Sequence, residues 1–145
     1  MPQLKNQTIS VKLFLSSFLI LLAINYIFLL TEIRIDTGME ITKIAEGYRS
    51  LESIEYVENV FEYLFWFIVT FGFTLGTFLF SSYKESVKRF FTVIIPLAIL
   101  SDMSSMGLMR YSDWFAFQMF LSGLTLAVCF FSLFWFVQHD LWFKK

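Results

Sequence analysis

The chain contains one cysteine and one histidine, and these two shortages exclude several kinds of chemistry. Cys129 lies inside an apolar run, and a single thiol can form neither an intrachain disulfide nor a CxxC redox pair. His139 stands near the end of the same run, and one imidazole cannot supply both axial ligands of a haem held between helices. We therefore predict no metal and no other cofactor.

Charge is also scarce, and it forms no basic cluster. Lys and Arg number 11 against 12 Asp and Glu, and charged residues make up 16% of the chain. Because nucleic-acid partners require a face of clustered Lys and Arg, we predict none. The apolar runs lack the pair of aspartates that a membrane aspartyl protease needs and the histidine that a membrane serine protease needs. The sequence also lacks a glycine-rich phosphate loop. The sequence thus predicts a protein with no catalytic residue and no enzymatic activity.

Long apolar runs, by contrast, take up most of the sequence. Hydrophobic residues make up 57% of the chain, and 20 residues are phenylalanine. Each of four runs has about the 20 residues that a helix needs to cross a bilayer. These runs cover residues 12–31, 60–80, 90–109 and 114–138. They predict an all-α integral membrane protein, a four-helix antiparallel bundle that forms one membrane domain over residues 1–145.

The distribution of basic residues predicts how the bundle is oriented, because short loops rich in Lys and Arg stay cytoplasmic. With four spans, both termini and the connection between the second and third runs share one side. That side carries Lys5, Lys12, Lys84, Lys88, Arg89, Lys144 and Lys145, whereas the other carries Arg34, Lys43, Arg49 and Arg110. We predict a bacterial inner-membrane protein with both termini in the cytoplasm.

The segment 32–58 is the sizeable part outside the apolar runs, and it is acidic. Thr37 and Glu40 match a capping box, which marks a helix start. Apolar residues then recur at helical spacing, at Ile41, Ile44, Ala45, Tyr48 and Leu51. We expect a short amphipathic helix between the first two spans, lying on the membrane surface or over the ends of the spans.

Similar capping signals precede the remaining spans. The matching residues are Asn59 with Glu62, Ser82 with Glu85, and Ser112 or Asp113. The connections between the last three spans are short, so these spans are predicted to be consecutive antiparallel neighbours.

Asp102 is the residue whose burial in the membrane costs most free energy, because its carboxylate lies in the middle of the third run. It is about 12 Å along a helix from Arg110, and a carboxylate at that depth is a candidate for function. One interpretation is a group that handles protons or cations. The other is a structural aspartate, hydrogen-bonded by nearby serines or by a neighbouring helix. The candidate intramembrane polar site comprises Asp102, Ser101, Ser104, Ser105 and Arg110.

Small residues mark candidate helix-packing faces. Gly72 and Gly76 form a GxxxG pattern in the second run, and Ser122, Gly123 and Ala127 form a similar face in the fourth. Such patterns let helix backbones approach closely. Packing within the bundle is the favoured use, and a homo-oligomer remains an alternative.

Two functions fit these features. The favoured one is a non-enzymatic subunit or accessory protein of a larger membrane complex, in contact with lipid and with other membrane protein subunits. The alternative is a small proton- or cation-coupled transporter or channel that uses Asp102.

Overall fold

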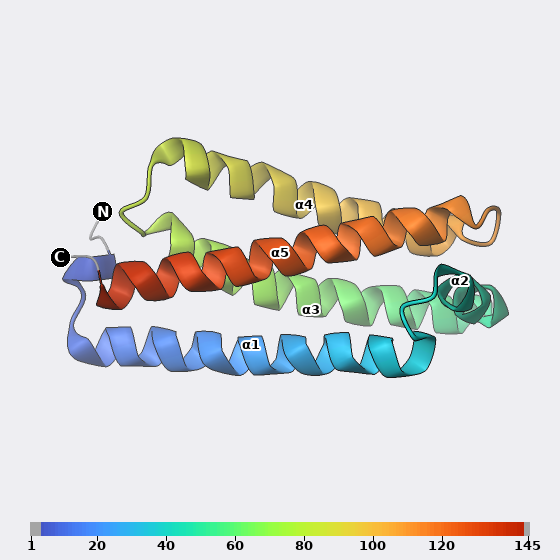
Figure 1. Ribbon diagram of the computed structural model, residues 1–145, viewed down its shortest axis with the longest axis horizontal. Helices are drawn as coiled ribbons and strands as arrows, with labels where there is room; N and C mark the ends of the chain where they lie inside the picture. Colours follow the sequence, from blue (N-terminus) through green and yellow to red (C-terminus); the bar gives the residue numbers. More distant parts are fainter. Residues whose placement is uncertain (1–3, 144–145) are drawn as a thin grey trace.

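The computed structural model describes residues 4–143, which form α-helices and one short 3-10 helix (Figure 1). In chain order the elements are η1 (Leu4–Asn6), α1 (Ile9–Thr37), α2 (Ile41–Ser50), α3 (Ser53–Leu79), α4 (Glu85–Leu108) and α5 (Trp114–Trp142). The helices α1, α3, α4 and α5 are each long and apolar enough to cross a bilayer. The protein is therefore an integral membrane protein, and the predicted all-α fold with four spans is confirmed.

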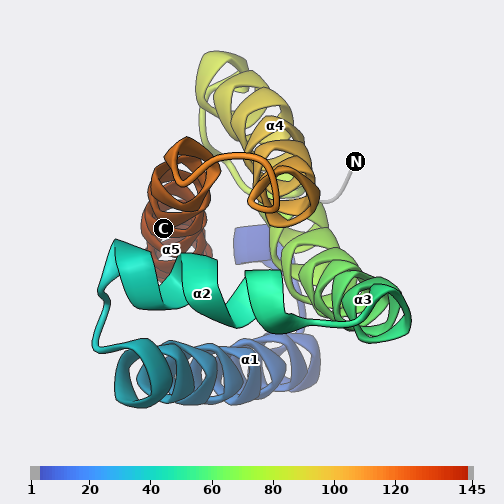
Figure 2. The same ribbon diagram turned by 90° about the vertical axis from the view of Figure 1, so that its right-hand side faces the viewer.

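Consecutive spans run antiparallel, so that α3 and α5 point in the same direction (Figure 1). α3 and α5 lie next to each other in the centre, with α4 on one side of this pair and α1 on the other (Figure 2). The contacts of α4 with both α3 and α5 confirm that the last three spans are consecutive neighbours. We call the end of the bundle that α2 covers the α2 end. The opposite end, where η1 and the last turns of α5 lie, is the terminal end.

Aromatic rings fill the core between α1, α3 and α5. Phe71, Phe78 and Phe130 are fully buried or nearly so. Tyr26 of α1 stacks on Phe130 with the ring centroids 4.8 Å apart, and Phe71 meets Phe130 edge-on at 6.1 Å. Edge-on and offset ring pairs of this kind are the arrangements that aromatic side chains prefer. The core therefore holds α1 to the rest of the bundle through rings.

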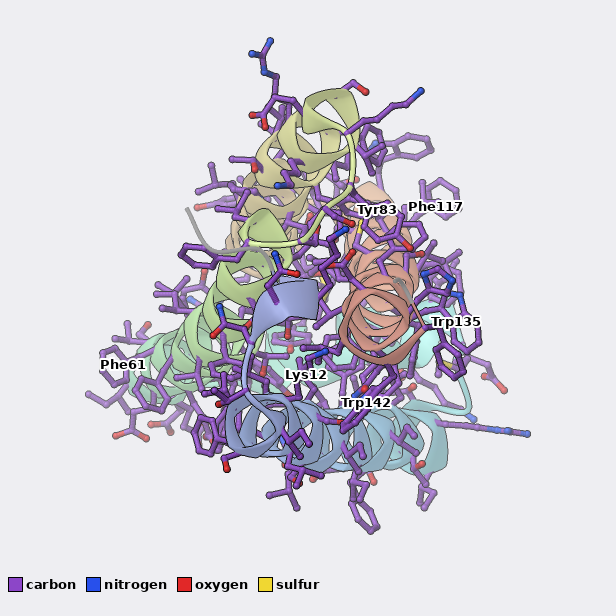
Figure 3. All side chains as sticks on the ribbon, turned by 90° about the vertical axis from the view of Figure 1, so that its left-hand side faces the viewer. Lys12, Phe61, Tyr83, Phe117, Trp135 and Trp142 are labelled. Carbon is purple, nitrogen blue, oxygen red and sulfur yellow. The ribbon has the colours of Figure 1, made fainter. Side chains whose placement is uncertain are left out.

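Large apolar side chains also cover the outside of the bundle. Figure 3 shows them projecting away from the spans, with Phe61 and Trp135 among the labelled examples. Such a surface suits the hydrocarbon of a bilayer, with tryptophan near the interfaces. Lys144 and Lys145, which add to the predicted basic side, lie outside the described residues.

The predicted amphipathic helix is confirmed as α2, and it lies over the ends of the spans (Figure 2). Its buried residues Ile44 and Ala45 pack against Met109 and Ala116, at the turn between α4 and α5. The helix thus caps the bundle with its apolar face inward.

Two arginines fasten α2 to that turn. Arg49 of α2 forms an ion pair with Asp113 at 2.7 Å, and its Nε donates to the carbonyl of Met109 at 3.3 Å. Arg110, from the turn itself, donates to the carbonyl of Leu51 at 3.0 Å. Polar contacts therefore run in both directions between α2 and the α4–α5 turn.

The predicted capping box at Thr37 and Glu40 is wrong, because Thr37 belongs to the end of α1. Its hydroxyl donates to the carbonyl of Ile33, one turn earlier, and accepts from the amide of Met39. Gly38 then ends α1 in the left-handed region, at φ 59°, which glycine adopts without steric cost. The motif therefore terminates one helix, and Glu40 is the N-cap of the next without a side-chain capping bond.

The other predicted caps have mixed outcomes. The Asn59–Glu62 cap is wrong, since α3 begins seven residues earlier with a capping box between Glu52 and Glu55. The Ser82 cap is also wrong, because α4 has Lys84 as its N-cap. At α5 the N-cap is Asp113, as predicted, although it makes no side-chain capping bond.

Candidate functional site

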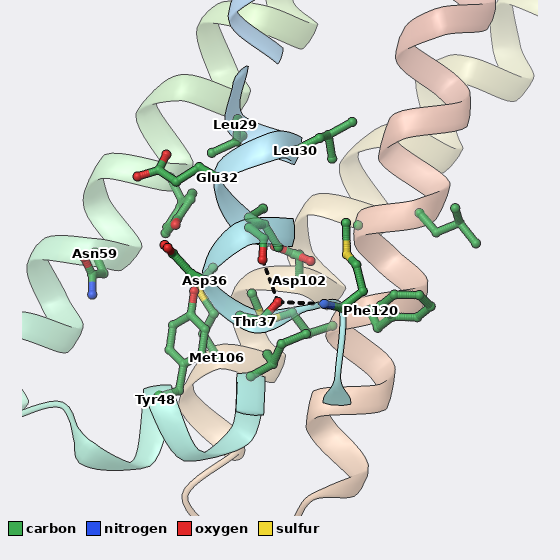
Figure 4. A pocket seen from close by; sticks show the side chains of 18 of the residues that line it. Leu29, Leu30, Glu32, Asp36, Thr37, Tyr48, Asn59, Asp102, Met106 and Phe120 are labelled. Carbon is green, nitrogen blue, oxygen red and sulfur yellow. Dashed lines mark hydrogen bonds between the residues drawn. The ribbon is translucent and has the colours of Figure 1, made fainter. Parts of the chain in front are cut away.

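A cavity of about 580 Å³ lies at the α2 end, between α1 and the other helices (Figure 4). Its walls are mostly aliphatic and aromatic, and every α-helix of the described chain contributes to them. The polar residues in the lining are Tyr26, Glu32, Asp36, Thr37, Lys43, Tyr48, Asn59, Tyr63 and Asp102. A space of this size is typical of small-molecule sites in proteins.

The cavity exists because α1 stops packing tightly part-way along its length. Leu19, Leu22, Ala23 and Tyr26 are buried, but no residue of α1 from position 27 to 37 is. Over this stretch Leu29, Leu30 and Ile33 of α1 line the cavity and are only partly buried. A second hollow of about 380 Å³ adjoins the cavity between α1 and α3. The exposed residues Phe28 and Trp66 line this hollow, so the two spaces together reach the outer surface of the bundle.

Asp102 lines the inner part of this cavity and is only 3% exposed. The Ser122 hydroxyl of α5 donates to its Oδ1 at 2.7 Å. Its other oxygen, Oδ2, accepts no hydrogen bond from residues 4–143. Every fully buried side-chain oxygen of these residues has a hydrogen-bond partner, so Oδ2 is not fully buried. It follows that Oδ2 reaches the cavity.

Three tyrosines surround the same space. Tyr26 of α1, Tyr48 of α2 and Tyr63 of α3 all line the cavity, and each lies within electrostatic range of Asp102. The phenols of Tyr48 and Tyr63 lie close to each other. Burial, followed by the proximity of Tyr63 and Asp102, raises the pKa of the Tyr48 phenol above its ordinary value. Tyr48 therefore stays neutral across the physiological range.

The rim of the cavity is acidic. Glu32 and Asp36 of α1 lie at its edge (Figure 4). Lys43 is the one basic residue in the lining, and it forms an ion pair with Glu40 at 3.2 Å. The lining as a whole thus carries three carboxylates against one amine, which gives it a negative potential.

The serines predicted to surround Asp102 bond elsewhere. Ser104 and Ser105 donate to the carbonyl of Ser101 in their own helix, at 3.0 and 2.6 Å. The Ser101 hydroxyl accepts from the side chain of Gln118 at 3.1 Å. The partner of Asp102 is Ser122, a residue that the sequence placed on a packing face.

Arg110 is not brought to Asp102 either. Besides its bond to Leu51, it lies over the ring of Tyr56, 5.4 Å from the centroid. Its guanidinium therefore binds the segment between α2 and α3 and does not contact the Asp102 carboxylate.

The two small-residue faces have different surroundings. A Cβ at Gly123 would lie 4.0 Å from Asp102 Oδ1, and Ala127 lines the cavity beside it. A Cβ at Gly72 or Gly76 would meet no atom within 4 Å. The GxxxG pattern of α3 thus makes no close helix contact among the described residues, which corrects the predicted packing role.

Sequence reasoning missed a second buried carboxylate, Asp140, at the terminal end. It is fully buried and accepts hydrogen bonds from both the amide and the hydroxyl of Ser82, in the α3–α4 turn. Asp140 follows the fourth apolar run, where polar residues usually lie at the membrane–water interface, so the sequence did not indicate that it is buried. Glu32, Asp36 and Tyr48 were missed as lining residues because they lie outside the predicted spans.

Residues 4–143 hold no cluster of three or more histidine, cysteine or carboxylate side chains arranged for a metal ion. Comparisons with protein-family models, curated proteins and solved structures found no match to this chain. The cavity and its lining are therefore the features that indicate a function.

Proposed function

We propose that the chain is a non-enzymatic membrane protein that binds a small membrane-embedded molecule in the cavity at the α2 end. The observation that carries this proposal is the cavity itself, with apolar walls and a path to the bundle surface between α1 and α3. Apolar walls with a few convergent polar groups are the usual features of a ligand site. A molecule dissolved in the bilayer would reach such a site laterally.

The packing of the terminal half favours binding over conduction. Towards that end the cavity lining stops at Tyr26, Phe67, Asp102 and Ala127. Beyond these residues Phe78 and Leu133 are completely buried in the core. A ligand in the cavity thus meets a closed floor towards the terminal end.

The basic residues support an orientation with this floor facing the cytoplasm. Lys5, Lys12, Lys84, Lys88 and Arg89 all belong to segments at the terminal end. We place the protein in a bacterial inner membrane with both termini cytoplasmic. The cavity then lies in the outer half of the bilayer.

A neutral photolabel tests the proposal. An adamantane that carries a diazirine, added to the protein in nanodiscs, is expected to label the cavity segments that contain Met106 and Met119. Gly123→Leu should remove most of this labelling, because there is room for its Cβ and the rest of the side chain enters the cavity. Peptide mass spectrometry of the labelled protein gives the measurement.

The matched control is Gly72→Leu, the same substitution at a glycine with open space around it. It should leave the labelling of the cavity segments unchanged. Equal labelling of these segments in wild type and Gly123→Leu would contradict the proposal.

A second candidate is a subunit or accessory protein of a larger membrane complex. The exposed surface at Gly72 favours it, because a small residue there leaves room for a helix of another subunit. We expect other membrane proteins to co-purify with the chain in mild detergent, and Gly72→Leu to reduce their yield. Isolation from native membranes as a homogeneous protein free of other subunits would count against this candidate.

A further inference from the structure

Building on the proposed binding function, we infer that the ligand is an organic cation with an apolar body, and that Asp102 holds its charge. Asp102 is the most buried polar residue in the lining, and one of its two oxygens faces the cavity. A buried carboxylate without a counter-charge is costly in an apolar environment. A bound cation offsets that cost.

The groups around Asp102 do not supply this counter-charge. Ser122 satisfies Oδ1 with a neutral hydroxyl. Lys43 lies at the rim and is engaged by Glu40, and Arg110 contacts Leu51 and Tyr56. No cationic side chain of residues 4–143 contacts Asp102, and a cationic occupant of the cavity would supply the balancing charge.

The aromatic lining suits the same ligand. Tyr26, Tyr63, Phe67 and Phe120 contribute rings to the wall. Ring faces attract organic ammonium-type cations, and combinations of aromatic rings with a carboxylate recognise them in other proteins. The apolar part of the ligand would pack against the aliphatic wall.

The acidic residues at the rim of the cavity favour cationic ligands over anionic ones. Glu32 lines both the cavity and the adjoining hollow through which a molecule would enter, and Asp36 lies at the rim of the cavity. Their charge attracts cations and repels anions. A neutral amphiphile would gain from the apolar wall but nothing from the three carboxylates. A cation alone uses every feature of the site.

Two ions of the same shape and opposite charge separate these possibilities. Tetraphenylphosphonium and tetraphenylborate each carry four phenyl rings around a central charge. We expect saturable binding of tetraphenylphosphonium to the full-length protein in phosphatidylcholine nanodiscs, after subtraction of binding to empty nanodiscs. Tetraphenylborate should show no saturable component.

Asp102→Asn is expected to weaken tetraphenylphosphonium binding about tenfold or more. The variant keeps the shape of the side chain and an oxygen for Ser122, so the helix pairing is preserved. Glu85→Gln makes the same chemical change on the same helix, at an exposed position of the terminal end. It should bind tetraphenylphosphonium as wild type does.

Saturable binding of both ions, or equal affinity in Asp102→Asn and wild type, would overturn the inference in favour of a neutral ligand. Failure of tetraphenylphosphonium to bind would overturn it too. In each case diazirine labelling that is lost in Gly123→Leu would leave the proposed binding function intact. Labelling that is insensitive to Gly123→Leu would instead refute the binding function itself.

Discussion

Replacing Asp140 by alanine is expected to lower the free energy of unfolding by about 3 kcal/mol, because two buried hydrogen bonds to a carboxylate are lost. The side chain is fully buried and accepts from the amide of Ser82 at 3.1 Å and from its hydroxyl. Ser82 lies in the turn between α3 and α4, whereas Asp140 lies in the last turns of α5. These bonds therefore join three spans at the terminal end, and alanine would leave both donors of Ser82 without this acceptor.

The measurement is unfolding in mixed micelles with a rising fraction of dodecyl sulfate, followed by the fluorescence of the four tryptophans. Asp140→Asn retains one acceptor oxygen and should lose less stability than Asp140→Ala. Asp113→Ala removes an exposed carboxylate from the other end of α5 and should cost at most about 1 kcal/mol, the usual limit for a surface ion pair. Unfolding of Asp140→Ala at the wild-type detergent fraction would show that the Ser82 contacts do not stabilise the fold.

The four spans could be predicted because a bilayer imposes a simple requirement on the chain. Every backbone polar group within the hydrocarbon must be satisfied, so about 20 consecutive apolar residues form a helix. The same requirement does not locate the helix ends. α1 continues through Glu32, Arg34 and Asp36, since polar residues outside the hydrocarbon can extend a helix that is already formed. A hydropathy pattern therefore predicts the apolar part of such a helix and not its polar extension.

Local capping patterns predicted helix starts less well, because one pattern fits more than one backbone path. The segment from Thr37 to Glu40 resembles a helix start, but Gly38 allows the left-handed turn that ends α1 there. At the α3–α4 turn, Ser82 has a hydroxyl suited to a cap, and it is used by Asp140 of a helix 58 residues away. Tertiary contacts thus decided between uses that are equivalent locally.

Asp102 could be recognised from the sequence because a carboxylate in an apolar run is energetically exceptional. Its partner could not, because the meeting of Asp102 with Ser122 depends on which faces of α4 and α5 turn toward each other. The cavity was not predictable either, since it depends on how loosely α1 packs beyond Tyr26. A run of apolar residues looks the same whether it packs against a helix, lipid or an empty space.

Phe130→Ala is the second substitution with a large expected effect, a loss of about 3 kcal/mol in the free energy of unfolding. The ring is completely buried. It stacks on Tyr26 at 4.8 Å and meets Phe71 edge-on at 6.1 Å, so it joins α1, α3 and α5. Because lipid is as apolar as the core, the loss comes from missing packing contacts between helices more than from solvation.

The matched control is Phe131→Ala, the same change at the next residue of α5. Phe131 also meets the Tyr26 ring edge-on at 6.1 Å, but it is 40% exposed, so lipid can occupy much of the space that its ring leaves. Its cost should stay within about 1 kcal/mol, measured by the same detergent titration. Equal losses in the two variants would mean that ring burial between the spans does not hold α1 in place. A selective loss in Phe130→Ala would instead show that the ring contacts of Phe130 with Tyr26 and Phe71 stabilise the packing of α1 on the bundle.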